Sequence, residues 1–137
     1  MSSLAAYQAG VPMMEELFID GIDHEWCFRA WSKGYAVRVS NRVTMLHDMG
    51  DASLNYFGRY KPVHRSPVRH YYVVRNTLYL TRLAYLPLGW RLRELLKTPR
   101  RIAAYVLFSS DRWRTVRLIA HALCDGLAGR MGACAWA

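Results

Sequence analysis

The spacing of apolar and polar residues predicts that the second half of the chain is helical. A first helix, over residues 66–83, opens with a serine that can cap it and a proline at the first helical position. Two shorter helices, over residues 90–96 and 100–108, are expected on either side of Pro99. A last amphipathic helix is expected over residues 111–127, with an aspartate as its cap and glycines after its end.

The first half of the chain mixes helix and strand. A short capped helix is expected over residues 2–9, and the helical spacing of tryptophan, cysteine and alanine predicts a second over residues 23–34. Residues 35–39 and 43–47 have the pattern of short strands, whereas residues 52–65 show no clear period. Two or three strands cannot form a parallel sheet on their own, which indicates that this chain is one end of a larger α/β fold.

Composition restricts the classes of protein that this chain can be. It has 137 residues, of which 53% are apolar and 21% charged, so it fits one domain or part of one and not a disordered chain. Its three cysteines are scattered, which argues against a disulfide framework. No stretch without charged residues reaches the length of a membrane span, and no signal peptide is expected.

The net charge of +9 is divided unevenly along the sequence. Residues 1–58 carry four basic and seven acidic side chains, whereas residues 59–137 carry fifteen basic and three acidic ones. An acidic part suits metal or proton chemistry, and a basic, aromatic-rich part suits a phospholipid surface, a nucleic acid or a phosphorylated substrate. A solvated basic face without a partner has the same composition. No recognised nucleic-acid-binding motif is present, so no nucleic acid is expected as a partner.

The densest group of chemically active side chains is Asp20-Gly-Ile-Asp23-His24-Glu25-Trp26. Asp23 falls at an expected helix start, where backbone amides and the positive helix end keep a carboxylate ionised and oriented. Such a carboxylate can accept a proton from a hydroxyl nucleophile, so Asp23 is a candidate general base, although a simple N-cap has the same spacing. His24 points elsewhere on the helix and is assigned no role.

His47 ends the second expected strand, and an imidazole before a polar loop can ligate a divalent metal ion. A lone histidine is more often a satisfied surface or core residue, and Asp48 and Asp51 beside it are typical solvated loop acids. The helix expected from residue 66 is dense in tyrosine and arginine, which suits either a membrane interface or the cover of another domain's core.

Three groups of residues are informative together. The first is Leu17-Phe-Ile-Asp-Gly-Ile-Asp-His-Glu-Trp-Cys-Phe-Arg-Ala-Trp-Ser-Lys-Gly-Tyr35. The second is His47 with Gly50-Asp51, followed by Ser66-Pro67-x-Arg69-x-Tyr71-Tyr72-x-x-Arg75-Asn76. The third is Asp125-Gly-Leu-Ala-Gly-Arg-Met-Gly132. Together they resemble family 2 glycosyltransferases, and most of all the bacterial rhamnosyltransferase branch, over nearly the whole chain.

The resemblance implies the C-terminal portion of a GT-A fold, an α/β nucleotide-binding sandwich, here as two or three short strands followed by mostly α-helices. Residues 1–58 would form the acceptor and catalytic-base half, and residues 59–137 a basic, aromatic-rich helical region. Such enzymes transfer a sugar from a nucleotide donor to an acceptor hydroxyl with inversion. This branch would use dTDP-rhamnose as donor and a saccharide or lipid-linked acceptor, in cell-surface polysaccharide or O-antigen synthesis.

The resemblance also implies roles for individual residues. Asp23 falls on the position of the catalytic base. Glu25 falls on its acidic neighbour, acceptor-facing or supporting, and Glu25 and Trp26 are the expected acceptor-binding residues. Trp26 and Arg29 fall on motif positions that are interpreted as packing positions. His47 falls on the position that, in related members, joins an Asp-x-Asp motif around a divalent metal ion, Mg or Mn.

The chain departs from the family pattern in length. Family members have a further N-terminal half that holds the donor site, and no Asp-x-Asp occurs in this sequence. We therefore expect a truncated or split glycosyltransferase that is inactive alone, cytoplasmic and peripheral on the inner face of the bacterial plasma membrane. The alternative is a non-catalytic basic helical module that binds an anionic membrane surface.

Overall fold

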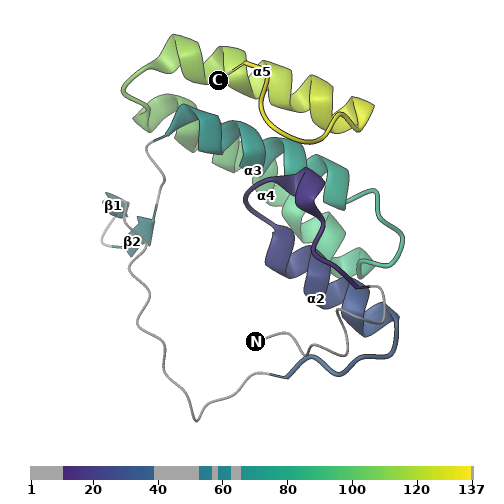
Figure 1. Cartoon of the computed structure of the whole chain (residues 1–137). Coiled ribbons are helices and arrows are strands. Elements are labelled where there is room, and N and C mark those ends of the chain that lie inside the picture. The colour runs from purple at the N-terminus through teal and green to yellow at the C-terminus, as the bar shows by residue number, and fades with distance from the viewer. Residues whose placement is uncertain (1–10, 39–52, 57–58, 63–65, 137) are drawn as a thin grey trace.

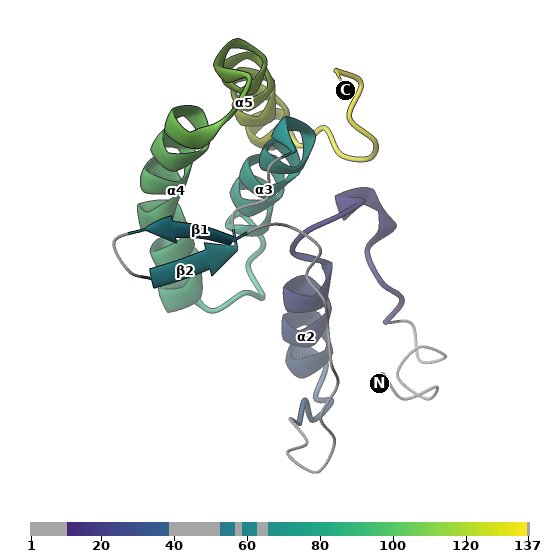
Figure 2. The same ribbon diagram turned by 90° about the vertical axis from the view of Figure 1, so that its left-hand side faces the viewer.

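The computed structural model describes residues 11–38, 53–56, 59–62 and 66–136, with the backbone alone for residues 53–62. Its elements are the 3₁₀ helix η1 (Glu15–Leu17), helix α2 (Ile22–Ser32), strands β1 (Ser53–Tyr56) and β2 (Arg59–Pro62), and helices α3 (Pro67–Leu80), α4 (Leu88–Phe108) and α5 (Arg112–Ala128) (Figure 1). Helices α3, α4 and α5 pack on one another, and α2 lies on the side of α3 away from α5 in both views (Figures 1 and 2).

The main core lies between α3 and α5. Tyr71, Tyr72 and Val74 of α3 meet Leu118 and Ala122 of α5 in one buried cluster. The tyrosine- and arginine-rich face of α3 therefore packs inside the protein. This argues against a membrane interface on that face, because residues buried in this way do not contact lipid, and the role as a cover of another domain's core stays a prediction.

A second cluster joins η1 and α2 to the end of α3. Leu17, Leu80 and Leu86 are buried in it, and Ile22 and Phe28 of α2 are among the partly buried residues packed against them. Apolar burial of this kind is the main favourable term in folding. It fixes the start of α2 against α3, which is the geometry on which the candidate site depends.

Three of the predicted helices, found as α2, α3 and α5, are confirmed, with ends shifted by a few residues. Helix α3 has Ser66 as its N-cap residue and Pro67 in its first turn, as predicted. Helix α5 is capped by Asp111, whose side chain accepts a hydrogen bond from the backbone N–H of Arg114. Both starts were predictable because local capping chemistry determines them.

The predicted break at Pro99 is wrong, because α4 runs without interruption through this residue. A proline inside a helix removes the hydrogen bond to the carbonyl four residues earlier. Pro99 lies on the exposed side of α4, and so does Leu95, the residue whose carbonyl is freed. Water can hydrate that carbonyl, so the cost of keeping the helix continuous is reduced.

The strand predictions fare less well. Residues 35–38 are not in a strand, whereas the rest of both predicted strands and the helix at 2–9 lie outside the described residues. An antiparallel hairpin, β1–β2, instead occupies part of residues 52–65, with Ser53 opposite Pro62. Its short strands are mostly polar, so they carry no periodic signal.

The predominantly helical structure is consistent with the helical C-terminal portion that was expected, and the GT-A fold stays a prediction. None of the described helices combines the length and apolar character of a transmembrane span.

Candidate functional site at the start of helix α2

Helix α2 starts from a turn that only glycine adopts easily. Gly21 is the N-cap residue with a φ of 87°, in the left-handed region, and its carbonyl accepts the backbone N–H of Glu25 at 2.9 Å. The helix predicted to start at Asp23 thus starts one residue earlier, at Ile22, and Asp23 lies exposed in the first turn and does not cap the helix. A carboxylate there is still favoured by the positive end of the helix.

The turn before α2 is held by α3. The side-chain nitrogen Nδ2 of Asn76 donates to the carbonyl oxygens of Leu17, Ile19 and Asp20, at 2.9, 2.6 and 2.8 Å. Nε of Arg69 forms an ion pair with Oδ2 of Asp20 at 3.1 Å. Asp20 has a φ of 61°, unusual for a residue other than glycine. These contacts hold that backbone and so set the direction in which α2 leaves the turn.

Arg75 connects the same turn to the C-terminal segment. Its fully buried guanidinium donates to the carbonyl oxygens of Leu17 at 3.1 Å and Gly132 at 2.6 Å, and to Oδ1 of Asn76 at 3.0 Å. It also lies over the ring of Tyr72, 4.9 Å from the centroid. A buried charge needs partners of this kind, and Arg75 has them on three segments.

Asp125 ties the third group of residues to α3. Its carboxylate accepts hydrogen bonds from Tyr71 Oη at 2.8 Å, Arg130 Nε at 2.7 Å and Trp136 Nε1 at 3.3 Å. Burial opposes ionisation, but these donors outweigh it and hold the pKa of Asp125 below its ordinary value. Burial and the bond to Asp125 raise the pKa of Tyr71 to about 12. The described parts of the three groups of residues that carried the resemblance therefore meet around α3.

Glu25 and Trp26 face the protein and not open solvent. Glu25 is buried, and its Oε1 accepts hydrogen bonds from Arg29 Nε at 2.7 Å and Tyr85 Oη at 2.5 Å. Burial and the hydrogen bond to Glu25 raise the pKa of Tyr85. Trp26 donates from Nε1 to the carbonyl of Val11 at 2.8 Å. This geometry favours the supporting role for Glu25, and a contact of either residue with an acceptor stays a prediction.

A pocket of about 470 Å³ opens beside the start of α2, between α3 and α4. Its lining comes from the turn, α2, α3 and α4: Asp20, Gly21, His24, Val73, Asn76, Thr77, Leu80, Trp90, Glu94, Lys97, Arg101 and Tyr105. Two carboxylates, two cations and an indole ring are thus combined in one polar cavity, which suits a polar ligand with an apolar face.

The structure brings His24 to this pocket and leaves Asp23 on the same turn, outside the lining. The α4 residues of the lining were not singled out from the sequence. The only signal for them is the helical spacing of Glu94, Lys97 and Arg101, and Glu94 does form ion pairs with both cations, at 3.0 and 2.7 Å.

The predicted metal site cannot be built from the described residues. His47 and its neighbours Asp48 and Asp51 lie outside them. Within the part of the chain that the structure describes, no group of three histidine, cysteine, aspartate or glutamate side chains could hold a metal ion. We therefore derive no chemical step through a metal, and His47 as a ligand of Mg or Mn stays a prediction.

Comparison with known proteins supports the resemblance that the motifs carry. No protein-family profile matches the chain, and no solved structure matches it. The dTDP-rhamnosyl transferase RfbF of Shigella flexneri is 35% identical over 120 residues, which are 88% of this chain and 40% of that protein. The chain thus spans less than half the length of this relative. The similarity confirms that the chain is rhamnosyltransferase-like, and the assignment to family 2 stays a prediction.

Proposed function

We propose that this chain forms the acceptor side of a glycosyltransferase that moves rhamnose from dTDP-rhamnose to a hydroxyl of a saccharide or lipid-linked acceptor. The observation that carries the proposal is the position of Asp23, exposed in the first turn of a helix whose approach is fixed by Arg69 and Asn76. The similarity to the Shigella flexneri protein supports the donor and the type of reaction.

In the proposed reaction, the acceptor oxygen forms a bond to the anomeric carbon of the sugar as the bond from that carbon to the diphosphate breaks. The hydroxyl proton passes to the carboxylate of Asp23, and the nucleoside diphosphate leaves with its electron pair. Attack from the face opposite the leaving group inverts the anomeric centre. The positive end of α2 favours a carboxylate at this position, on the first turn of the helix.

The pocket beside α2 supplies a place for the acceptor. The ring of Trp90 can cover the apolar face of a sugar, and the charged groups of Asp20, Glu94 and Lys97 can exchange hydrogen bonds with its hydroxyls. His24 lines the pocket one residue after Asp23, so a saccharide bound there lies next to the proposed base.

A hybrid enzyme tests the proposal. The matched 120-residue segment of the Shigella flexneri protein is replaced by the corresponding segment of this chain, and transfer of labelled rhamnose from dTDP-rhamnose is measured. Asp23→Asn should lower kcat about 10²- to 10⁴-fold, the usual contribution of a general base. Glu15→Gln removes an exposed carboxylate close by in the sequence and should leave the rate unchanged. Equal rates for the two variants would exclude Asp23 as the base.

A second variant of the hybrid tests the pocket. His24→Ala should raise KM for the saccharide acceptor several-fold and leave KM for dTDP-rhamnose unchanged, because His24 lines the pocket that we assign to the acceptor. A change confined to KM for the donor would show that the pocket serves the other substrate.

A further inference from the structure

Helix α4 turns its polar side inward, unlike an ordinary surface helix. The side that faces α3 carries polar and aromatic residues, among them Trp90, Glu94, Thr98, Arg101 and Tyr105, all buried or half-buried. A surface helix of a globular protein normally turns its apolar stripe toward the core and its charged side toward water. In α4 Ile102 packs against the main core, but most of the leucines face away from it.

The outward side of α4 is apolar along the length of the helix. Leu88, Leu92, Leu96 and Leu107 are 63%, 51%, 81% and 62% exposed, and Leu95 is 40% exposed. Pro99 and Ala103 lie exposed between them. The intervals of three, four and eight residues keep these side chains on one side of a helix. At 1.5 Å per residue, this apolar stripe is about 30 Å long.

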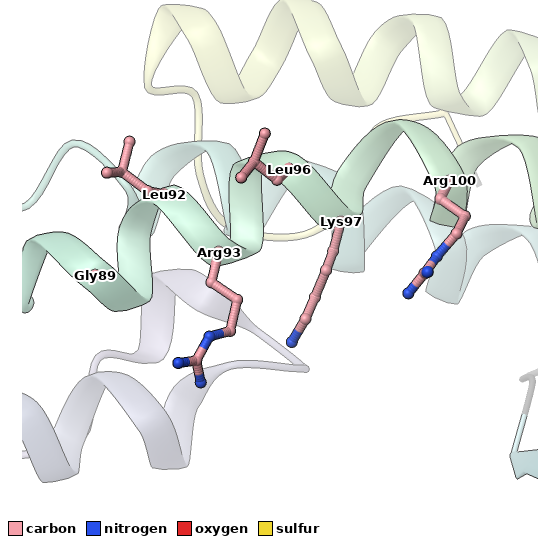
Figure 3. Close-up of a pocket in the computed structure, with 6 residues that line it drawn as sticks. All are labelled: Gly89, Leu92, Arg93, Leu96, Lys97 and Arg100. Atoms are coloured by element: carbon pink, nitrogen blue, oxygen red, sulfur yellow. The ribbon is translucent and has the colours of Figure 1, made fainter.

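A row of cations runs beside the stripe. Figure 3 shows Leu92 and Leu96 pointing to one side of α4 and Arg93, Lys97 and Arg100 pointing to the other. Together with Gly89 these residues line an open hollow of about 570 Å³. We call these three cations the basic row. Arg93 and Arg100 form no ion pair within the described residues. Glu94, the one acidic residue in the sequence of α4, is buried and already paired.

We propose that the apolar stripe and the basic row of α4 bind the surface of an anionic phospholipid bilayer, with the helix lying in the plane of the interface. Leucines can enter the boundary between headgroups and acyl chains, and long cationic side chains beside them can reach the phosphates. The charge complementarity favours lipid over a second copy of the chain, because another copy would bring the same cations to the contact. The proposal does not depend on the sugar-transfer proposal, since of its residues only Lys97 also lines the pocket assigned to the acceptor, and the variants that test it leave Lys97 in place.

Sedimentation of the whole chain with vesicles tests this surface. Vesicles of phosphatidylcholine with and without phosphatidylglycerol are compared at low and high salt. Leu92→Gln with Leu96→Gln removes the middle of the stripe, and Arg93→Gln with Arg100→Gln removes two charges of the row. The matched controls are Leu127→Gln, at an exposed leucine of α5, and Arg114→Gln with Arg117→Gln, which remove the same charge from α5.

The native chain should bind the vesicles that contain phosphatidylglycerol and release as salt is raised. Both α4 variants should bind about tenfold or more weakly, with an unchanged circular dichroism spectrum, and both α5 controls should bind as the native chain does. Equal binding by the α4 variants and the controls would overturn the proposal, as would absence of vesicle binding by the native chain. A native dimer in sedimentation velocity that the leucine variant alone converts to monomer, without vesicle binding, would assign the stripe to a second copy instead.

Discussion

Gly126 of α5 lies directly against the backbone of Arg75 in α3. A Cβ atom built at Gly126 would be 2.9 Å from the carbonyl oxygen of Arg75 and 3.0 Å from Cβ of Leu78. Real Cβ contacts are longer than this, so the absence of a side chain at position 126 allows the two helices to approach. Arg75 can then reach both the turn before α2 and the C-terminal segment.

Replacing Gly126 with alanine should separate α3 from α5. We expect Gly126→Ala to lower the free energy of unfolding by about 1–3 kcal/mol, the usual cost of inserting a methyl group into a close-packed contact. Gly89→Ala is the matched control, because nothing lies within 4 Å of a Cβ there. In helix α4 that change should be neutral or stabilise by up to about 1 kcal/mol. Urea unfolding measures both, and equal effects at the two sites would contradict the contact.

The buried guanidinium of Arg75 should not be replaceable by a lysine ammonium. Arg75→Lys keeps the charge but loses the planar set of donors that serves Leu17 and Gly132 together, so buried carbonyls are left without partners. We expect a loss of about 3 kcal/mol in the free energy of unfolding. Arg117→Lys, on the exposed side of α5, should change stability by less than about 0.5 kcal/mol.

Local chemistry made part of this structure predictable from sequence. The starts of α3 and α5 follow from Ser66 and Asp111, which act on the helix turn next to them. The start of α2 was predicted one residue late, at Asp23, because the feature that determines it is the left-handed backbone of Gly21. The turn before α2 is held by hydrogen bonds from α3, which is distant in sequence.

In the candidate site, too, the features set by local sequence were predictable and those set by contacts distant in sequence were not. The motif identified Asp23, Glu25 and the α3 residues, because each lies in a short recognisable string. The pocket beside α2 was not predictable, since His24 and the α4 residues come together only when α4 packs its polar side inward. Sequence periodicity gives the apolar side of a helix, and in α4 that side does not face the core.

The carboxylate of Asp125 should make stability depend on pH in acid. Its pKa is held below the ordinary value of 3.8, so the ionised form is favoured by folding. The resulting stability is present above the ordinary pKa and is lost as pH falls through the lower pKa of the folded state. Asp125→Asn should therefore be destabilised by about 1–3 kcal/mol near neutral pH, and the difference from the native chain should shrink as the solution is acidified. If the difference in the free energy of unfolding between the native chain and Asp125→Asn stays constant as the pH falls below the ordinary pKa of the carboxyl, Asp125 is not ionised in the folded chain.

The contact between Glu25 and Tyr85 provides a test of whether Glu25 supports α2 or faces the acceptor. Oε1 of Glu25 accepts from Tyr85 Oη at 2.5 Å, and both side chains lie at the junction of α2 with the segment after α3. Glu25→Gln and Tyr85→Phe should each destabilise the chain by about 1–3 kcal/mol, and the double variant by less than the sum, because the second change removes a partner already lost. If Glu25 only supports α2, then Glu25→Gln in the hybrid enzyme should change KM for the acceptor by no more than about twofold, at equal amounts of folded enzyme. Additive unfolding effects together with a large rise in that KM would instead place Glu25 against the acceptor, with Tyr85 as a separate packing residue.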